Sequence, residues 1–246
     1  MIAVNFHGNL VDLLSRKSEN GPFVTLHLER RTSVKDLIES FGIPHPEIEE
    51  IVVGRKTVDF AYIVEDGNQI EVFPISAQSN FFKPSLLRPD PLESHRFVVD
   101  INVAKLAPKL RQLGFDTLLP RNCDDAGLAA IAGCQRRILL TRDCNLLKRK
   151  IVEFGHLVRA ESPNDQLAEI IKLFKLKDKI KPYSRCFRCN GLLNPVAKED
   201  ILPFLEPLTK KYYHVFHRCL DCKKIYWFGS HREKMDEILH EILASC

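Results

Sequence analysis

Short apolar segments alternate with helical patterns between residues 96 and 180, and this alternation constrains the fold more than any other feature of the sequence. Strands are predicted at residues 96–100, 117–119, 138–143 and 156–159. They lack the polar alternation of a half-exposed strand, as is typical of parallel strands that helices cover on both faces. The regular succession of strand and helix therefore predicts a parallel, three-layer α/β domain over residues 96–180.

The first helix of this domain is predicted from its apolar spacing. Apolar residues lie at offsets 0, 3, 4, 7 and 10 from Val103, and Gly114 ends the pattern. Pro108 fits only if the helix begins near Ala104, because its missing N–H group then falls in the first turn.

Carboxylates stand at the ends of the predicted strands. Asp100 and Asp143 each follow an apolar strand, and Asp124 and Asp125 open a helix. Because parallel strands end at one edge of a sheet, these acids are expected to converge there. Carboxylates held together repel one another and are usually stabilised by a hard divalent cation. Mg²⁺ or Mn²⁺ at such a cluster can activate water against a phosphodiester. Each acid also has a structural interpretation, as a helix cap or a strand end.

Basic residues near these acids are candidates for binding the phosphates of RNA. In the central domain they are Lys105, Arg111 and Arg142, with Lys109 and residues 148–150 as further cations. The chain as a whole carries a net charge of +4, but residues 1–78 hold 7 Lys/Arg against 12 Asp/Glu. An acidic front and a basic remainder suggest that the second part faces a polyanion, although solvated surface charge would look the same.

Four of the eight cysteines form two C-x-x-C pairs, Cys186/Cys189 and Cys219/Cys222. Two such pairs can complete the tetrahedron of a structural zinc site, which predicts a zinc ribbon in residues 181–246. His217 is expected to lie beside this site. Cations and aromatic residues alternate around the second pair, which suits RNA binding by Arg218, Lys223 and Lys224. The alternative is that the aromatic residues form the small core of the ribbon. A last helix is predicted from the capping box at residues 230–233.

Residues 1–76 predict a separate small domain. Strands near residues 2–6, 24–28, 51–53 and 70–73 flank a helix that Ser33 opens, in the order β-β-α-β-β. This order resembles the ubiquitin-like β-grasp fold, as do the segments 33–39, 42–47 and 58–60. Sulfur carriers of this fold end in a free Gly-Gly, whereas this chain continues beyond the last strand. A docking or stabilising role is therefore expected for the domain, with a protein as its binding partner. Residues 77–95 hold three prolines and predict a semi-extended linker, and residues 1–76 are expected to fold alone.

No apolar run approaches the roughly 20 residues that a membrane helix needs. The first residues lack the basic and apolar regions of a signal peptide, so the cytoplasm is the expected location.

Several segments resemble the PIN-like ribonuclease domain of the Mut-seven C-terminal family: 97–100, 105–106, 110–117, 124–125, 137–143, 184–191, 225–227 and 229–231. Members of this family often carry the same β-grasp domain in front. The resemblance implies a metal-dependent ribonuclease with Asp100, Asp124 and/or Asp125, and Asp143 at the metal site. A fourth acid is common in PIN domains, and Glu161 and Asp165 are the candidates for it here. Asp165 has the alternative role of closing the N-terminus of its own helix.

Three functions are compatible with these patterns. The first is a ribonuclease that uses Mg²⁺ or Mn²⁺, with a zinc ribbon that helps to bind RNA. The second is a non-catalytic module that binds RNA or the ribosome, in which the acids are structural. The third is a nuclease that acts on structured DNA. The sequence does not select the RNA substrate, endonucleolytic or exonucleolytic cleavage, or the oligomeric state.

Overall fold

The computed structural model describes residues 1–14 and 21–227, and the chain divides into two compact units. Unit 1 comprises residues 1–102 and 120–159, and unit 2 comprises residues 103–119 and 160–246. The helix predicted from residues 230–233 lies outside the described residues. No helix in the described part of the chain is long and apolar enough to cross a membrane.

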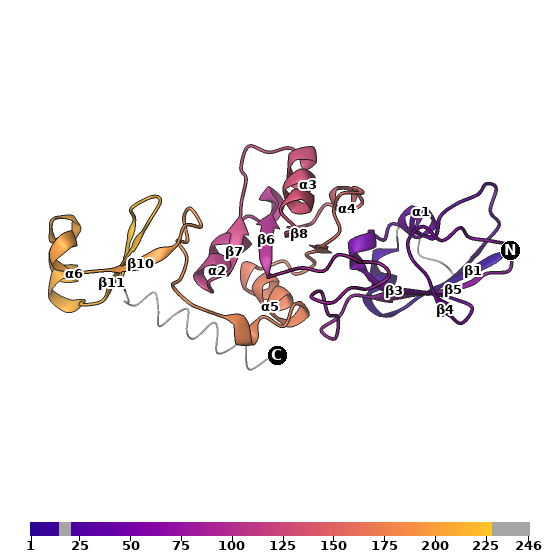
Figure 1. Ribbon diagram of the computed structural model, residues 1–246, viewed down its shortest axis with the longest axis horizontal. Coiled ribbons are helices and arrows are strands. Elements are labelled where there is room, and N and C mark those ends of the chain that lie inside the picture. Colours follow the sequence, from indigo (N-terminus) through magenta and orange to yellow (C-terminus); the bar gives the residue numbers. More distant parts are fainter. Residues whose placement is uncertain (15–20, 228–246) are drawn as a thin grey trace. The chain divides into compact units, whose positions relative to one another are not determined.

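Unit 1 begins with a five-stranded sheet in the order β2-β1-β5-β3-β4 (Figure 1). The strands are β1 (Ile2–Phe6), β2 (Phe23–Leu26), β3 (Ile48–Val53), β4 (Lys56–Thr57) and β5 (Gln69–Pro74). β1 pairs with β5 in parallel, and the other neighbours are antiparallel. Two 3-10 helices, η1 (Gly8–Leu13) and η2 (His45–Glu47), lie between strands. The predicted β-β-α-β-β order is confirmed, with β4 as an additional short strand.

The helix α1 (Val34–Ser40) begins where the sequence predicts, because the Ser33 hydroxyl accepts a hydrogen bond from the backbone N–H of Asp36. Alternate residues of β1 are fully buried, so that Ile2 and Val4 join a continuous core with Leu37 and Ile38. The N-terminal residues therefore form a ubiquitin-like domain with a core of its own.

The second sheet of unit 1 consists of parallel strands. β6 (Arg96–Val99) pairs with β8 (Ile138–Thr141), and β8 pairs with β9 (Gly155–Leu157). The apolar residues of β6 and β8 are fully buried. Helices α3 (Asp125–Cys134) and α4 (Cys144–Leu147) pack against these strands. The predicted central parallel sheet is confirmed.

The segment predicted as a linker packs closely onto both parts of unit 1. Phe81, Leu87 and Leu92 are buried. The Arg88 guanidinium is also buried, and it donates hydrogen bonds to the carbonyl oxygens of Pro46 and Ile48. Residues 77–95 thus have the composition of a linker, but side-chain contacts hold them in place.

Unit 2 contains α2 (Leu106–Gln112), β7 (Asp116–Leu118) and α5 (Pro163–Leu173), and α2 packs against both of the others. The 3-10 helices η3 (Ile101–Val103) and η4 (Lys177–Lys179) flank these elements. Pro108 is the third residue of α2, where its missing donor is not needed. Gly114 ends α2 with a φ of +94°, and a Cβ there would lie 2.2 Å from the Lys181 carbonyl oxygen.

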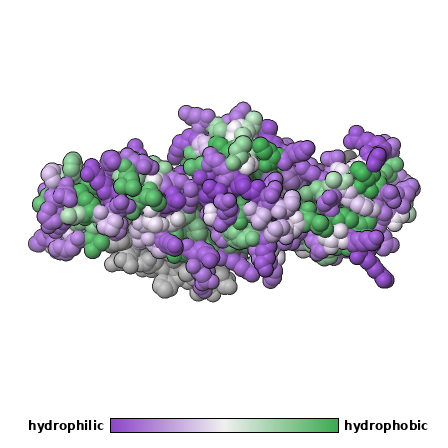
Figure 2. Space-filling model, viewed as in Figure 1, coloured by the Kyte–Doolittle hydropathy of each residue, from purple (hydrophilic) through white to green (hydrophobic). Residues whose placement is uncertain are grey.

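The cysteine-bearing part of unit 2 is a three-stranded antiparallel sheet in the order β10-β11-β12. Its strands are β10 (Leu193–Val196), β11 (Phe216–Cys219) and β12 (Ile225–Trp227). Between β10 and β11 lie η5 (Glu199–Phe204) and α6 (Pro207–Tyr212). Hydrophobic and hydrophilic residues are interspersed on the visible face of this part (Figure 2). The mixed α/β fold class, with a ribbon at the C-terminal side, agrees with the sequence prediction.

Candidate acidic site and metal centre

Asp100 follows β6 directly and is 7% exposed. Its Oδ1 accepts a hydrogen bond from the backbone N–H of Ile101 at 2.6 Å. Its Oδ2 accepts hydrogen bonds from the Thr141 hydroxyl at 2.7 Å and the Asn102 side-chain amide at 2.6 Å. Three donors thus hold one carboxylate in a fixed orientation at the end of the strand.

Thr141 links Asp100 to Asp143. It is fully buried at the end of β8, and its Oγ1 accepts a hydrogen bond from the backbone N–H of Asp143 at 2.9 Å. Asn102 completes the network, because its side-chain oxygen accepts a hydrogen bond from the backbone N–H of Arg142 at 3.1 Å. The ends of two neighbouring parallel strands are therefore joined by polar side chains.

Asp143 and Asp124 also serve as helix caps. Asp143 Oδ1 accepts hydrogen bonds from the backbone N–H groups of Asn145 and Leu146, and Asp124 Oδ1 accepts one from Gly127. In both residues these hydrogen bonds use Oδ1. As far as the described residues are concerned, Oδ2 therefore remains available for another ligand. Asp125 lies in the first turn of α3 and is exposed.

The acids do not form a compact group of three or more metal ligands among the described residues. Mg²⁺ commonly uses only one or two protein carboxylates, with water and phosphate oxygens as its other ligands. Asp100 and Asp143 supply hard oxygen donors of this kind on two adjacent strands. Their donor chemistry fits such a cation, whereas the participation of Asp124 and Asp125 stays a prediction.

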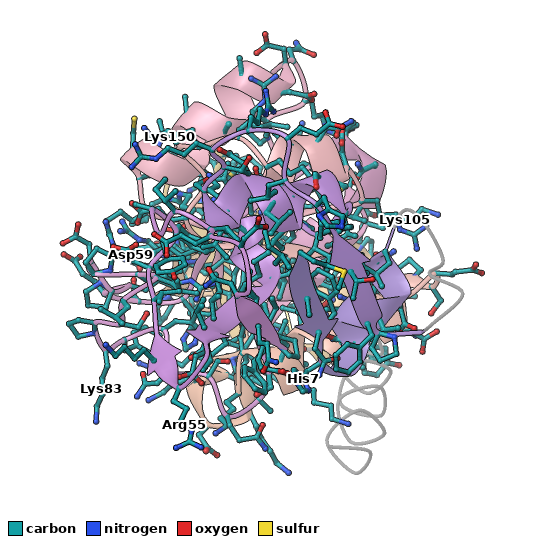
Figure 3. The ribbon with its side chains drawn as sticks, turned by 90° about the vertical axis from the view of Figure 1, so that its right-hand side faces the viewer. His7, Arg55, Asp59, Lys83, Lys105 and Lys150 are labelled. Carbon is teal, nitrogen blue, oxygen red and sulfur yellow. The ribbon has the colours of Figure 1, made fainter. Side chains whose placement is uncertain are left out.

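The predicted phosphate-binding cations differ in exposure. Arg142 is exposed in unit 1, directly after Thr141. Lys105 is exposed in unit 2, and its side chain is labelled in Figure 3. Lys109 donates a hydrogen bond to the Asn164 side-chain oxygen at 2.7 Å, and burial lowers its pKa.

Arg111 is buried and binds backbone oxygens. Its guanidinium donates hydrogen bonds to the carbonyl oxygens of Thr117, Phe187 and Arg188 at 2.8, 3.2 and 2.9 Å. The last two residues lie inside the first C-x-x-C turn. Because its guanidinium is committed to these oxygens and is 6% exposed, Arg111 does not belong to a phosphate-binding surface.

The candidate fourth acids lie in unit 2. Glu161 is exposed, and Asp165 forms a capping pair with Ser162: the Asp165 N–H donates to the Ser162 hydroxyl, which donates to the Asp165 carboxylate. The N-terminus of α5 thus accounts for Asp165 structurally. A role for either acid at the metal site stays a prediction.

The four paired cysteines form one cluster. Their sulfur atoms all lie within 4.8 Å of one another, with Cys186–Cys222 at 3.5 Å and Cys189–Cys219 at 3.4 Å. Four thiolates about 2.3 Å from zinc would lie roughly 3.8 Å apart at the corners of a tetrahedron. These cysteines can therefore bind a zinc ion, and His217 is not part of the cluster.

Hydrogen bonds favour a thiolate at Cys186. Burial opposes ionisation, but the Tyr226 hydroxyl at 3.0 Å and the backbone N–H groups of Cys189 and Arg188 outweigh it, lowering the pKa of Cys186 to about 6. Burial raises the pKa of Cys219 to about 12. The cluster therefore already stabilises one metal-binding thiolate, through a tyrosine that packs beside it.

The aromatic residues near the second cysteine pair divide between core and surface. Tyr213 and Tyr226 pack against the apolar clusters of the ribbon. Tyr212 and Trp227 are 61% and 42% exposed. The core alternative therefore holds for Tyr213 and Tyr226, whereas RNA binding near the exposed aromatic residues stays a prediction.

Sequence reasoning did not identify Thr141 and Asn102 as members of the acidic network. Each is a polar residue where an apolar strand gives way to a turn, and that position is the only sequence signal for it.

Two family descriptions match the chain. The Mut7-C RNAse domain matches residues 95–239, and Mut7-C ubiquitin matches residues 1–80. A comparison with curated proteins and another with solved structures gave no match.

Proposed function

The chain belongs to the Mut7-C RNAse domain family, and from that membership we propose that it is a ribonuclease that requires Mg²⁺ or Mn²⁺. The observation that carries the proposal is the linkage of Asp100 and Asp143 through Thr141 at the ends of two adjacent parallel strands. Ligands of open α/β sheets gather at this edge.

Asp100 and Asp143 would hold the cation, with Asp124 and Asp125 as further ligands. When bound, such an ion neutralises phosphate charge and lowers the pKa of a coordinated water. Thr141 and Asn102 keep the Asp100 carboxylate in place, and Arg142 of the same unit binds a flanking phosphate of the RNA. Lys105 is a further candidate for phosphate binding on unit 2. A zinc ion held by Cys186, Cys189, Cys219 and Cys222 would be structural, and the ribbon would add to RNA binding through Arg218, Lys223 and Lys224.

The ubiquitin-like domain is proposed to stabilise the nuclease domain. Glu47 is fully buried, and its carboxylate accepts hydrogen bonds from the backbone N–H of Leu157 and the guanidinium of Arg159. Lys148 donates a hydrogen bond to the Glu39 carbonyl oxygen. These contacts support attachment of the domain to the central sheet, and its exposed remainder is available to a protein partner. The boundaries 1–76, 77–95, 96–180 and 181–246 remain proposals.

The second candidate function is a non-catalytic module that binds RNA or the ribosome. The observation in its favour is that Asp124 and Asp143 cap helices, a role that does not need a metal. Cleavage of structured DNA is the other alternative, and it requires the same acids.

The test is cleavage of labelled tRNA, rRNA, mRNA, single-stranded DNA and hairpin DNA by the full chain, with Mg²⁺ or Mn²⁺ and with excess chelator. We expect metal-dependent RNA cleavage that Asp100→Asn and Asp143→Asn reduce at least a hundredfold, while RNA affinity stays within about twofold. Asparagine is also a good helix N-cap, so Asp143→Asn preserves the fold of α4.

Asp59→Asn is the matched control. Asp59 Oδ1 accepts a turn hydrogen bond from the Ala61 N–H, and the residue is exposed in the ubiquitin-like domain. RNA binding by the wild-type chain without any metal-dependent cleavage would leave the binding module as the better function, and preferential cleavage of hairpin DNA would favour the DNA nuclease.

A further inference from the structure

The two faces of the ribbon sheet carry different clusters. Side chains alternate between the faces of a strand. On one face, Leu193, Cys219 and Tyr226 pack with Cys186 around the sulfur cluster. On the other face, Phe216 packs with Ile201 and Leu205 of the segment between β10 and β11. The cysteine cluster and this second core therefore cover most of the ribbon sheet.

One end of the second face stays open as a groove of about 250 Å³. Asn194 of β10 and Arg218 of β11, which pair in register, line it together with Leu220 and Lys223. The groove combines an amide, two cations and an apolar side chain. This set suits a ligand that has both hydrogen-bonding edges and negative charge.

An exposed aromatic ring lies beside this groove. Phe204 ends η5 and is 68% exposed, and the Arg218 guanidinium carbon lies 5.9 Å from its ring centroid. Phe204 is not part of the buried cluster that Ile201 and Leu205 form with Phe216. Its ring is available as a stacking surface next to a cation.

The cations of the groove are oriented by backbone oxygens. Arg218 Nε donates a hydrogen bond to the Lys223 carbonyl oxygen at 3.3 Å, and Lys223 Nζ donates one to the Leu220 carbonyl oxygen at 2.5 Å. Each cation keeps further N–H groups for a ligand. Neither one forms an ion pair with a carboxylate in the described part of the chain. Residues 181–227 contain nine Lys/Arg and four Asp/Glu, a net charge of +5.

We propose that this groove binds single-stranded RNA, with one base stacked on Phe204 and the adjoining phosphates on Arg218 and Lys223. The inference rests on the proposed ribonuclease function and specifies its substrate as unpaired RNA. Only a splayed base can stack on a protein ring, because both faces of a paired base are covered by its neighbours. Stacking beside a cationic track is the usual way to hold a single strand.

A second set of exposed side chains limits the alternative. Leu208 and Val215 are 69% and 55% exposed in the same part of unit 2, and they would suit a protein partner. Both side chains are aliphatic and offer no ring on which a base could stack beside a cation, and neither lines the groove. The position of Arg218, between the groove and the Phe204 ring, favours RNA.

The test measures fluorescence anisotropy of labelled oligouridylate, a blunt-ended RNA duplex of equal length and the single-stranded DNA that matches the oligouridylate. The protein is the full chain carrying Asp100→Asn, which prevents cleavage during titration. Phe204→Ala should weaken binding to oligouridylate about tenfold, as expected for the loss of one stacked base. Phe204→Trp should retain affinity, and Phe204→Ala should change binding of the RNA duplex less than twofold. Arg218→Ala should weaken all RNA binding and reduce the salt dependence by about one counterion.

Leu208→Ala is the matched control, because it removes an exposed apolar side chain from the ribbon without touching the groove. The proposal is overturned if Phe204→Ala binds oligouridylate like its parent, if Leu208→Ala weakens binding equally, or if the DNA strand binds more tightly than the RNA. Cleavage assays with Asp100 intact separate the two proposals. If cleavage depends on Asp100 but Phe204→Ala binds oligouridylate like its parent, the proposed RNA-binding role of the groove is refuted and the ribonuclease function stands.

Discussion

Replacing Glu47 with glutamine tests how firmly the ubiquitin-like domain is attached to the central sheet. Glu47 ends η2 and is fully buried. Its Oε1 accepts a hydrogen bond from the Leu157 N–H at 2.7 Å and lies 2.9 Å from His156 Nδ1. Its Oε2 accepts a hydrogen bond from Arg159 at 3.0 Å. The substitution keeps the shape of the side chain but removes its charge.

The expected loss follows from the burial of the partners. His156 is 4% exposed and Arg159 is 27% exposed at the side chain, so both lose a counter-charge that water replaces poorly. Removing one partner of a buried ion pair lowers the free energy of unfolding by about 3–5 kcal/mol. Because Arg159 is partly exposed, we expect Glu47→Gln to lose about 3 kcal/mol, the lower end of this range. The control is Glu71→Gln, which breaks an ion pair with His7 whose side chains are 36–37% exposed. That change should cost less than about 1 kcal/mol.

The effect should depend on pH in a defined direction. Burial acts to raise the pKa of Glu47, but the charges of His156 and Arg159 and the hydrogen bond from Leu157 outweigh it and hold the pKa below its ordinary value of 4.5. A carboxylate with a depressed folded-state pKa contributes its full stability above its unfolded pKa. That contribution is lost as the pH falls through the folded pKa. The free energies of unfolding of the parent and of Glu47→Gln should therefore differ most at pH 6–8 and converge as the pH falls below 4.5.

Urea unfolding followed by circular dichroism at pH 7 and at pH 4 measures the difference. A Glu47→Gln chain that is no less stable than Glu71→Gln at pH 7 would refute the burial argument. A loss that is larger at pH 4 than at pH 7 would refute the argument from charge.

Two further predictions concern the other domains. The purified chain should contain one zinc per molecule by elemental analysis. Cys189→Ser should abolish zinc binding and unfold the ribbon, because zinc stabilises it by on the order of 10 kcal/mol. A folded ribbon without zinc would contradict this. Residues 1–76 expressed alone should show a cooperative thermal transition by circular dichroism, because the buried residues of their core lie within this range apart from Leu87; an unfolded fragment would show that the proposed boundary is wrong.

Local signals made most of the fold predictable. Apolar runs located β6 and β8, and Ser33 located the start of α1, because these features act within a few residues of the chain. The C-x-x-C spacing likewise predicted the sulfur cluster, since each pair places two thiols on one turn. The positions of Asp100 and Asp143 after their strands were also readable from the sequence.

Long-range polar contacts were not predictable in the same way. Arg88 and Arg111 look like surface cations in the sequence, yet both are buried and bind backbone carbonyl oxygens. A carbonyl oxygen is present at every residue, so the sequence carries no mark of which one a guanidinium will find. Glu47 and His156 are more than a hundred residues apart, and no short pattern connects them.

The contacts of Arg111 imply that the first cysteine turn and the α2–β7 segment fold together. Arg111 on α2 binds two carbonyl oxygens inside that turn. Asn190, which has a φ of +75°, donates to the Asp116 carboxylate and accepts from the Thr117 N–H on β7. A metal that fixes the turn also fixes the acceptors of these bonds. Loss of zinc should therefore loosen α2 and β7, elements that the sequence assigns to the nuclease domain, and it should do so without any change to the acids themselves.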